Sequence, residues 1–202
     1  MKIKIFFLSL ICILLGLLLD KQNELIKIPK DERELEQIDK TIITGKITHI
    51  SDGDSFVMND NIKIRLFAID APELTQTCIL SEEILKETGE TVTTTTEIKC
   101  GENAKSKLEE LTNKKEISCL PKGKDAYGRI VSECYYDVKN RRTKKINKIN
   151  INKEMVATGN AIAFLSFSDK YLDDENKAKQ ENKGIWATTF DLPSVYRKKN
   201  QR

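Results

Sequence analysis

Short β-branched runs separated by turn residues constrain the fold of this chain more than any other feature of its sequence. Three of them follow one another closely: "TIITGKITHI" (41–50), "SFVM" (55–58) and "IKIRLFAI" (62–69), with only "SDGD" and "NDN" between them. Such runs are typical of strands, and the three-residue connection is typical of a hairpin. Two later runs, "EISCL" (116–120) and "RIVSECYY" (129–136), predict a further pair of strands. The chain must therefore pack five short strands.

Three helices are predicted between and after these strands. The segment "GENAKSKLEELTN" (101–113) places Ala104, Leu108 and Leu111 on one helical face. "NKEMVATG" (152–159) predicts a short helix with Asn152 as its N-cap and Gly159 just past its end. A longer helix is predicted from about Ser168 to Lys183, with Gly184 as its stop. The order of three strands, helix, two strands, helix, helix favours a mainly β fold with helices (α+β), a five-stranded OB-type barrel with about three α-helices.

Residues 75–100 are predicted to be a polar loop that includes the low-complexity stretch "TGETVTTTTE". A loop this long inside a compact domain needs a function or a covalent staple. The cysteines at positions 78, 100, 119 and 134 could supply one, and four cysteines allow three pairings. They lack the C-x-x-C spacing of a zinc site. We favour Cys119–Cys134, which flank a turn-rich segment, together with Cys78–Cys100.

The first twenty residues differ from the rest of the chain. Lys2 and Lys4 precede an uncharged apolar run over residues 5–19, which is typical of a secretory signal and short for a spanning helix. We expect residues 1–20 to be either a removed signal peptide or a membrane anchor. The protein is then extracytoplasmic, either secreted or anchored in the membrane through this segment. We expect a charged spacer over 21–40, the barrel domain over 41–190 and a basic C-terminal tail over 191–202.

Three short stretches carry the side chains that could perform chemistry: "DGDS" (52–55), "RLFAIDAPE" (65–73) and "DAYGR" (125–129). Each alone has an ordinary explanation as a turn or a strand end. Together they offer Asp54 and Asp70 as hard oxygen ligands suited to calcium or magnesium, and Glu73 as a third carboxylate beyond a rigid proline. Arg65 and Arg129 supply two planar guanidinium groups that match the oxygens of a phosphate.

Phosphodiester hydrolysis can use carboxylates that hold a cation and arginines that bind the negatively charged phosphate. A metal ion and two arginines neutralise the charge that a phosphate gains in the transition state, and a carboxylate can orient or deprotonate water. The alternative is a non-catalytic OB module that binds nucleic acid or protein. A binding-only module has no need for three acids, because carboxylates repel phosphate unless a cation lies between them.

The joint pattern "DGDSFVM…IRLFAIDAPE…KDAYGR…INKEMVATGNAIAF…AKQENKGIW" resembles the staphylococcal nuclease (thermonuclease) family over residues 42–187. The resemblance implies an OB-type five-stranded barrel with three helices. It also implies a calcium-dependent phosphodiesterase, an endonuclease that cuts DNA and RNA and leaves 3′-phosphates. We expect such an enzyme to act as a monomer.

The resemblance also implies roles for particular residues. Asp54 and Asp70 correspond to the carboxylate ligands of the calcium ion (Ca²⁺), and Ala71 to a position that contributes its backbone carbonyl. Glu73 corresponds to the proposed general base, and Arg65 and Arg129 to the phosphate-binding arginines. The threonine-rich insertion after "APE", the four cysteines and the inserted "NRRTKKINK" (140–148) depart from the best-known members. These departures leave every catalytic position in place and put substrate preference in question.

Overall fold

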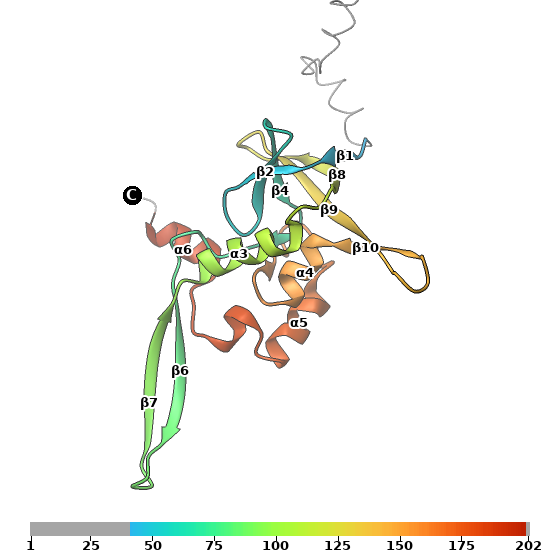
Figure 1. Ribbon diagram of the computed structural model, residues 1–202. Coiled ribbons are helices and arrows are strands. Elements are labelled where there is room, and N and C mark those ends of the chain that lie inside the picture. Colours follow the sequence, from blue (N-terminus) through green and yellow to red (C-terminus); the bar gives the residue numbers. More distant parts are fainter. Residues whose placement is uncertain (1–40, 201–202) are drawn as a thin grey trace, which may run out of the picture. The chain divides into compact units, whose positions relative to one another are not determined.

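The computed structural model describes residues 41–200, whose strands form one large sheet and two small ones (Figure 1). The large sheet has the order β1-β8-β9-β4-β3-β2, and β10 pairs with β9. Every neighbouring pair in it is antiparallel except β4 and β9, which are parallel. Its strands are β1 (Ile43–Gly45), β2 (Ile47–Ile50), β3 (Ser55–Met58), β4 (Ile62–Leu66), β8 (Ile117–Lys124), β9 (Ile130–Lys139) and β10 (Ile146–Asn150).

The mixed α+β class predicted from the sequence is confirmed. Closure of the large sheet is not seen, because its recorded pairs form an open path within residues 41–200. The two ends of that path, β1 and β2, are nevertheless separated in sequence by Lys46 alone. Four α-helices rather than three are described: α3 (Cys100–Thr112), α4 (Ile151–Ala157), α5 (Leu172–Gln180) and α6 (Pro193–Asn200).

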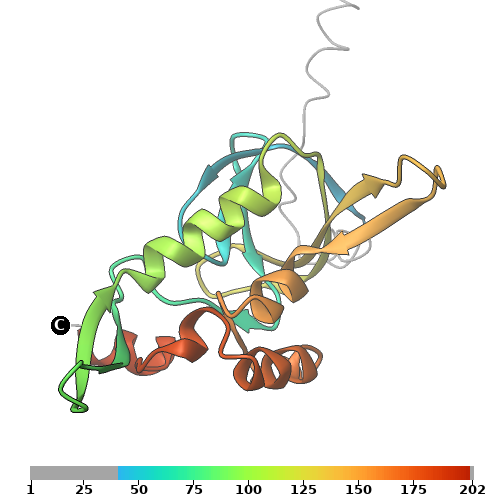
Figure 2. The ribbon, with the colours of Figure 1, turned by 60° about the horizontal axis from the view of Figure 1, so that its bottom comes forward.

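The core lies where one face of the sheet meets α3 and α4. Ile64 and Leu66 of β4 are fully buried, whereas Lys63 and Arg65 alternate with them and point to the other side. The predicted apolar face of α3 is confirmed, since its Ala104, Leu108 and Leu111 are all buried. α3 packs beside β2 and α4 (Figure 2).

The strand predicted over 62–69 ends earlier, at Leu66. Ala68 adopts a positive φ of 58° in the turn that follows. A short strand, β5 (Ile69–Asp70), then pairs with β11 (Ile162–Ala163) in a sheet of its own. The turn brings Asp70 back toward Arg65, and the break in the strand therefore positions a candidate site residue.

The prediction of a polar loop over 75–100 was wrong. These residues form a hairpin of β6 (Cys78–Leu85) and β7 (Thr91–Ile98), paired in register along its whole length from Cys78↔Ile98 to Leu85↔Thr91. The hairpin extends away from the large sheet (Figures 1 and 2). Threonine and valine favour extended backbone, so the repeat that we interpreted as low complexity is a strand.

Both predicted disulfides are confirmed. Cys78–Cys100 joins the base of the hairpin to the first residue of α3, with the two Cα atoms 5.8 Å apart. Cys119–Cys134 joins directly opposed residues of β8 and β9, with the Cα atoms 4.0 Å apart. Disulfides persist in oxidising compartments, which supports an extracytoplasmic location.

Two helix predictions needed correction at their ends. Asn150, not Asn152, caps α4, and its side chain accepts a hydrogen bond from the Lys153 amide at 3.0 Å. The helix predicted from Ser168 to Lys183 is the shorter α5 (Leu172–Gln180), followed by a 3₁₀ turn, η1 (Gly184–Ala187). Asn182 has a positive φ of 49°, which an α-helix cannot contain, so α5 stops before it.

The residues predicted as a basic C-terminal tail contain α6, a helix whose first residue, Pro193, is buried. No helix described in the structure, over residues 41–200, is long and apolar enough to cross a membrane. The predicted leader (1–20) and charged spacer (21–40) lie outside the described residues.

A buried carboxylate, Glu133, joins β9 to the segment before α5. It is 2% exposed and pairs with Lys170 and with Lys122, the latter at 3.4 Å. The Tyr171 hydroxyl donates a further hydrogen bond to it at 3.2 Å. Burial raises the pKa of Glu133, but the hydrogen bond and charge of Lys170, with the charge of Lys122, outweigh this and leave the pKa below its ordinary value.

We expect Glu133→Gln to reduce the acid sensitivity of folding. A carboxylate whose pKa is lowered by folding stabilises the protein above its unfolded pKa of about 4.5, and this stability is lost as pH falls through the lower folded pKa. The wild-type protein should exceed the variant in free energy of unfolding near neutral pH, and the difference should shrink below about pH 4.5. Urea unfolding of both proteins across this range measures it, and a pH-independent difference would contradict the assignment.

Candidate active site

The turn between β2 and β3 places Asp54 at the start of β3. The Asp54 amide donates to the Asp52 carboxylate at 3.0 Å, and the Ser51 amide donates to the Ser55 carbonyl at 2.9 Å. A Cβ on Gly53 would lie 2.7 Å from the Cβ atoms of both Ala71 and Ala104, so only glycine fits this close approach. The turn therefore holds Asp54, which is 6% exposed, against the segment that carries Ala71.

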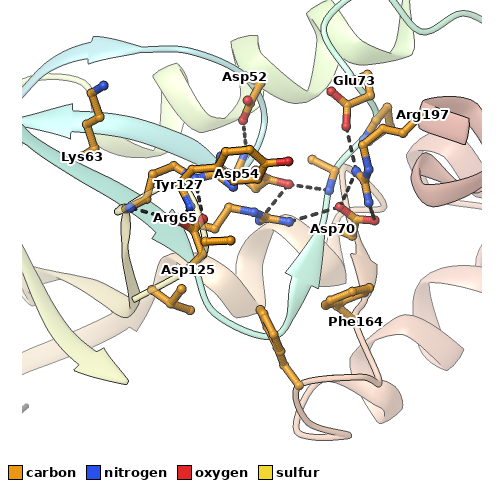
Figure 3. Close-up of a pocket in the computed structure, with 16 residues that line it drawn as sticks. Asp52, Asp54, Lys63, Arg65, Asp70, Glu73, Asp125, Tyr127, Phe164 and Arg197 are labelled. Carbon is orange, nitrogen blue, oxygen red and sulfur yellow. Dashed lines mark hydrogen bonds and ion pairs between the residues drawn. The ribbon is translucent and has the colours of Figure 1, made fainter. Parts of the chain in front are cut away.

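Arg65 of β4 links the two aspartates that we predicted as metal ligands. Its Nη1 lies 2.8 Å from Asp54 Oδ2, and its Nη2 lies 3.1 Å from Asp70 Oδ1. The Ala71 amide also donates to Asp54 Oδ2, at 2.8 Å. Asp54, Asp70 and Ala71 are thus brought together from separate strand ends, with one guanidinium group between the two carboxylates (Figure 3).

Arg129 reaches the same place from the turn between β8 and β9. Asp125 shapes that turn, because its Oδ1 accepts hydrogen bonds from the Tyr127 and Arg129 amides at 2.9 and 3.0 Å. Its Oδ2 pairs with Arg129 Nε at 2.6 Å. Burial raises the pKa of Asp125, but the hydrogen bonds from Arg129 outweigh it and lower that pKa overall.

The other end of the Arg129 guanidinium joins it to the aspartate cluster. Arg129 Nη1 donates to Ser55 Oγ at 3.1 Å, and Ser55 Oγ donates to Asp54 Oδ1 at 2.9 Å. Strand pairing explains this arrangement, because Ser55 lies opposite Arg65 in the β3–β4 ladder and Arg65 lies opposite Val131 in the β4–β9 ladder. The register of three strands thus aligns both arginines with Asp54.

Glu73 follows Pro72 and is held by a residue that the sequence reasoning missed. Arg197 of α6 places its Nη1 2.7 Å from Glu73 Oε1. The same guanidinium binds Asp70 through both nitrogens, with Nη1 and Nη2 each 3.0 Å from an Asp70 oxygen. The side chain of Arg197 lies between Asp70 and Glu73 (Figure 3). The sequence signal for Arg197 was the basic character of residues 191–202, which we predicted to be a C-terminal tail.

All six predicted site residues line one pocket of about 570 Å³ (Figure 3). Asp52, Asp125 and Arg197 line it as well, although none of them was predicted as a site residue. Phe164, Phe167 and Tyr127 add aromatic surface, and Tyr127 is 82% exposed. The pocket therefore combines a buried acidic floor, arginines on its walls and exposed rings at its edge.

The acids are crowded enough to perturb one another. Burial, followed by the charge of Asp54, raises the pKa of Asp52 to about 7. Burial also raises the pKa of Asp70, which is 1% exposed, although the hydrogen bond from Arg197 and the charge of Arg65 oppose the rise. Carboxylates placed this closely require positive charge among them, which three arginines supply.

The donor set suits a hard cation, although the carboxylates are paired with arginines. Asp54, Asp70 and the Ala71 carbonyl offer oxygen atoms of the kind that calcium prefers. Within residues 41–200, no three His, Cys, Asp or Glu side chains are gathered closely enough to hold a metal ion. The Arg65 and Arg197 guanidinium groups lie between the acids instead.

The chain is similar in sequence to known nucleases. Residues 63–188 match the family described as "SNase: Staphylococcal nuclease homologue". An "Uncharacterized endonuclease" of Haemophilus influenzae is 30% identical over 165 residues, which cover 78% of this chain and 75% of that protein. A "Micrococcal nuclease" of Shigella flexneri is 26% identical over 150 residues, covering 71% and 73% of the two chains. The chain therefore belongs to the staphylococcal nuclease family.

Proposed function

We propose that this nuclease is an exported, calcium-dependent enzyme that hydrolyses phosphodiester bonds of DNA and RNA. One observation carries the proposal: Asp54, Asp70, Glu73, Arg65 and Arg129 line a single pocket. The endonuclease and nuclease named among its relatives support this activity for the chain. Family membership disfavours the alternative of a non-catalytic binding module, as does the acidic floor of the pocket, which would repel a phosphate in the absence of a cation.

We assign the two arginines to the phosphate. Arg65 reaches the pocket from β4 and Arg129 from the turn before β9, and both carry the planar guanidinium group that matches phosphate geometry. Arg65 contacts a carboxylate oxygen of Asp54. Arg129 contacts a carboxylate oxygen of Asp125 and the hydroxyl oxygen of Ser55. Phosphate oxygens offer the same kind of acceptor, so a scissile phosphate between the two side chains would gain hydrogen bonds that strengthen as its charge grows.

We assign Asp54, Asp70 and the Ala71 carbonyl to the cation. The Asp54 and Asp70 oxygens lie beside Arg65, where a bound phosphate and a bound cation would be neighbours, and the Ala71 amide donates to Asp54. When bound, calcium would supply a positive charge that polarises a phosphoryl oxygen. The Asp52 carboxylate, which accepts the Asp54 amide, fixes the turn that aims Asp54.

We assign Glu73 to the attacking water. Its carboxylate is about one-third exposed at the pocket wall, so water can reach it, and an ionised carboxylate can accept a proton or orient a water molecule. Pro72 restricts the backbone just before it and the Glu73 amide donates to Gln76 Oε1 at 3.2 Å, which together limit where Glu73 can point.

The finer features of the fold and location belong to the same proposal. We infer that the large sheet without β10 is the five-stranded OB-type barrel of the family. Residues 43–50 would then act as one bent strand that pairs with β8 at one end and with β3 at the other. Export fits the two disulfides. Residues of a single chain line the pocket, which supports a monomeric enzyme.

We expect hydrolysis of single-stranded DNA and of RNA to stop when EGTA is added and to return when Ca²⁺ is added in excess. The carboxylates cannot approach a phosphate without a cation between them, so loss of the ion should remove both substrate binding and catalysis. Release of acid-soluble nucleotides by the purified protein measures the effect. Recovery on adding Ca²⁺ separates removal of the cation from damage to the protein, and hydrolysis that continues undiminished in EGTA would overturn the calcium assignment.

A further inference from the structure

We propose that Arg197 is an intramolecular competitor of the catalytic cation, so that docking of α6 and binding of Ca²⁺ oppose each other. The inference rests on the proposed calcium site. It concerns a part of the chain beyond residue 188, where the match to the family ends. The family match therefore gives no role to Arg197, and its contacts in this protein are the basis for assigning one.

The Arg197 guanidinium engages the same oxygens that we assign to the cation and to the attacking water. Asp70 Oδ1 accepts from Arg65 at 3.1 Å and from Arg197 at 3.0 Å, and Asp70 Oδ2 accepts from Arg197 at 3.0 Å. Glu73 Oε1 accepts from Arg197 at 2.7 Å. The two Asp70 oxygens therefore carry three arginine hydrogen bonds, and each oxygen has only two lone pairs.

The guanidinium group of Arg197 competes with a cation for these oxygens. Calcium requires ligand oxygens at about 2.3–2.6 Å, and the guanidinium nitrogens already lie about one hydrogen-bond length from both carboxylates. The two positive groups would also repel each other in a site where Asp70 is nearly inaccessible to water. Cation binding must therefore displace Arg197, or Arg197 must lower the affinity for the cation.

Contacts of α6 and of the segment just before it place Arg197 at this position. The Tyr196 hydroxyl donates to the Thr75 carbonyl at 3.1 Å, and the Gln76 amide group donates to the Asp191 carbonyl at 2.6 Å. Pro193 is buried at the start of the helix. These contacts hold α6 against the segment 73–76, which also carries Glu73. α6 is thus docked on the wall of the active site, and this docking determines the position of the Arg197 side chain.

Ca²⁺ binding and α6 docking are two equilibria that involve the same carboxylates. Each must change the equilibrium constant of the other by the same factor. If docked Arg197 weakens the binding of Ca²⁺, bound Ca²⁺ must weaken the docking of α6 equally. Only one-third of the Arg197 side chain is exposed in the docked state, so release would free it to reach solvent or the substrate. The C-terminal helix would thereby keep the carboxylates paired when the cation is scarce.

Calcium titration of the full chain by calorimetry tests the proposal, with Arg197→Ala compared with the wild-type protein. We expect Arg197→Ala to bind Ca²⁺ about tenfold more tightly, within the range typical of coupled sites. Lys198→Ala is the matched control, because it removes one positive charge from the next residue of α6, which is exposed. The control should change the Kd by less than about twofold, since an exposed charge is screened by solvent.

Hydrogen exchange on the wild-type protein gives a second measurement that needs no variant. Amides of α6 should exchange faster with saturating Ca²⁺ than with EGTA, while those of α3 should not. Equal or weaker Ca²⁺ binding by Arg197→Ala, or unchanged exchange in α6, would overturn the competition and leave the proposed function intact. If neither protein bound Ca²⁺, the calcium assignment itself would fail and this inference with it.

Discussion

Replacing Arg129 with alanine should lower kcat by about two to three orders of magnitude, the loss that follows removal of one donor aimed at the developing charge of a transition state. The structure explains how the Arg129 side chain is oriented for this role. Arg129 is oriented by Asp125 through Nε at 2.6 Å, which leaves its other nitrogens directed toward Ser55 and the pocket. Lys63 also lines this pocket but carries a point charge instead of a planar fork.

The measurement is steady-state hydrolysis of a short oligonucleotide in saturating Ca²⁺, with kcat and KM reported separately. Arg129→Lys tests the geometry of the fork, and we expect it to recover only part of the activity. Arg142→Ala is the control, because it removes an exposed arginine from the loop between β9 and β10. Nearly wild-type kcat in Arg129→Ala would contradict the phosphate role of Arg129. A change confined to KM in the control Arg142→Ala would leave that role intact.

The predicted site residues could be found from the sequence because each lies in a short motif at a strand end. Asp54 follows a Gly-containing turn, and Asp70 follows a strand that turns back on itself. The register of the strands then determines which of these motifs lie next to each other. The pairing of Ser55 with Arg65 is part of that register and could not be predicted from the motifs alone. Local composition therefore identified the residues, and the ladder explains why they share a pocket.

Arg197 could not be found in the same way. Its role depends on where α6 docks, and a run of three basic residues at a chain end carries no information about which acids it will meet. The contacts that place it, such as Tyr196 on Thr75, join residues more than a hundred positions apart. Only the packed structure brings them together, which is why a tail was predicted where a helix closes one wall of the site.

The hairpin of β6 and β7 was missed for a different reason. Its residues lack alternating apolar character, because "TVTTTTE" contains a single apolar residue, Val92. Periodicity detects half-buried strands, and this hairpin is mostly exposed, so its pattern gave no signal. The β-propensity of threonine and the predicted disulfide at the hairpin base were the observations that could have indicated it.

We expect Asn152→Ala to destabilise the fold by about 3 kcal/mol or more, the largest stability loss that we predict. Asn152 is completely buried, and its amide group joins three backbone positions. Its Oδ1 accepts from the Cys134 amide at 2.9 Å, and its Nδ2 donates to the carbonyls of Phe67 at 2.9 Å and Ser132 at 3.1 Å. The Ser132 carbonyl keeps a hydrogen bond from the Phe67 amide at 2.8 Å, whereas the Cys134 amide and the Phe67 carbonyl each lose the partner that Asn152 supplies. A buried backbone group left without a partner costs about 1–3 kcal/mol.

Asn150→Ala is the matched control, two residues earlier in the same chain segment. Asn150 caps α4 from a half-buried position, and removal of an N-cap costs about 1 kcal/mol. Urea unfolding followed by the fluorescence of Trp186, the only tryptophan, compares the two variants. A loss for Asn152→Ala no greater than that for Asn150→Ala would show that water satisfies the freed backbone groups. A clearly larger loss would establish that Asn152 ties β9 to the turn after β4, and so holds Arg65 and Asp70 in register at the active site.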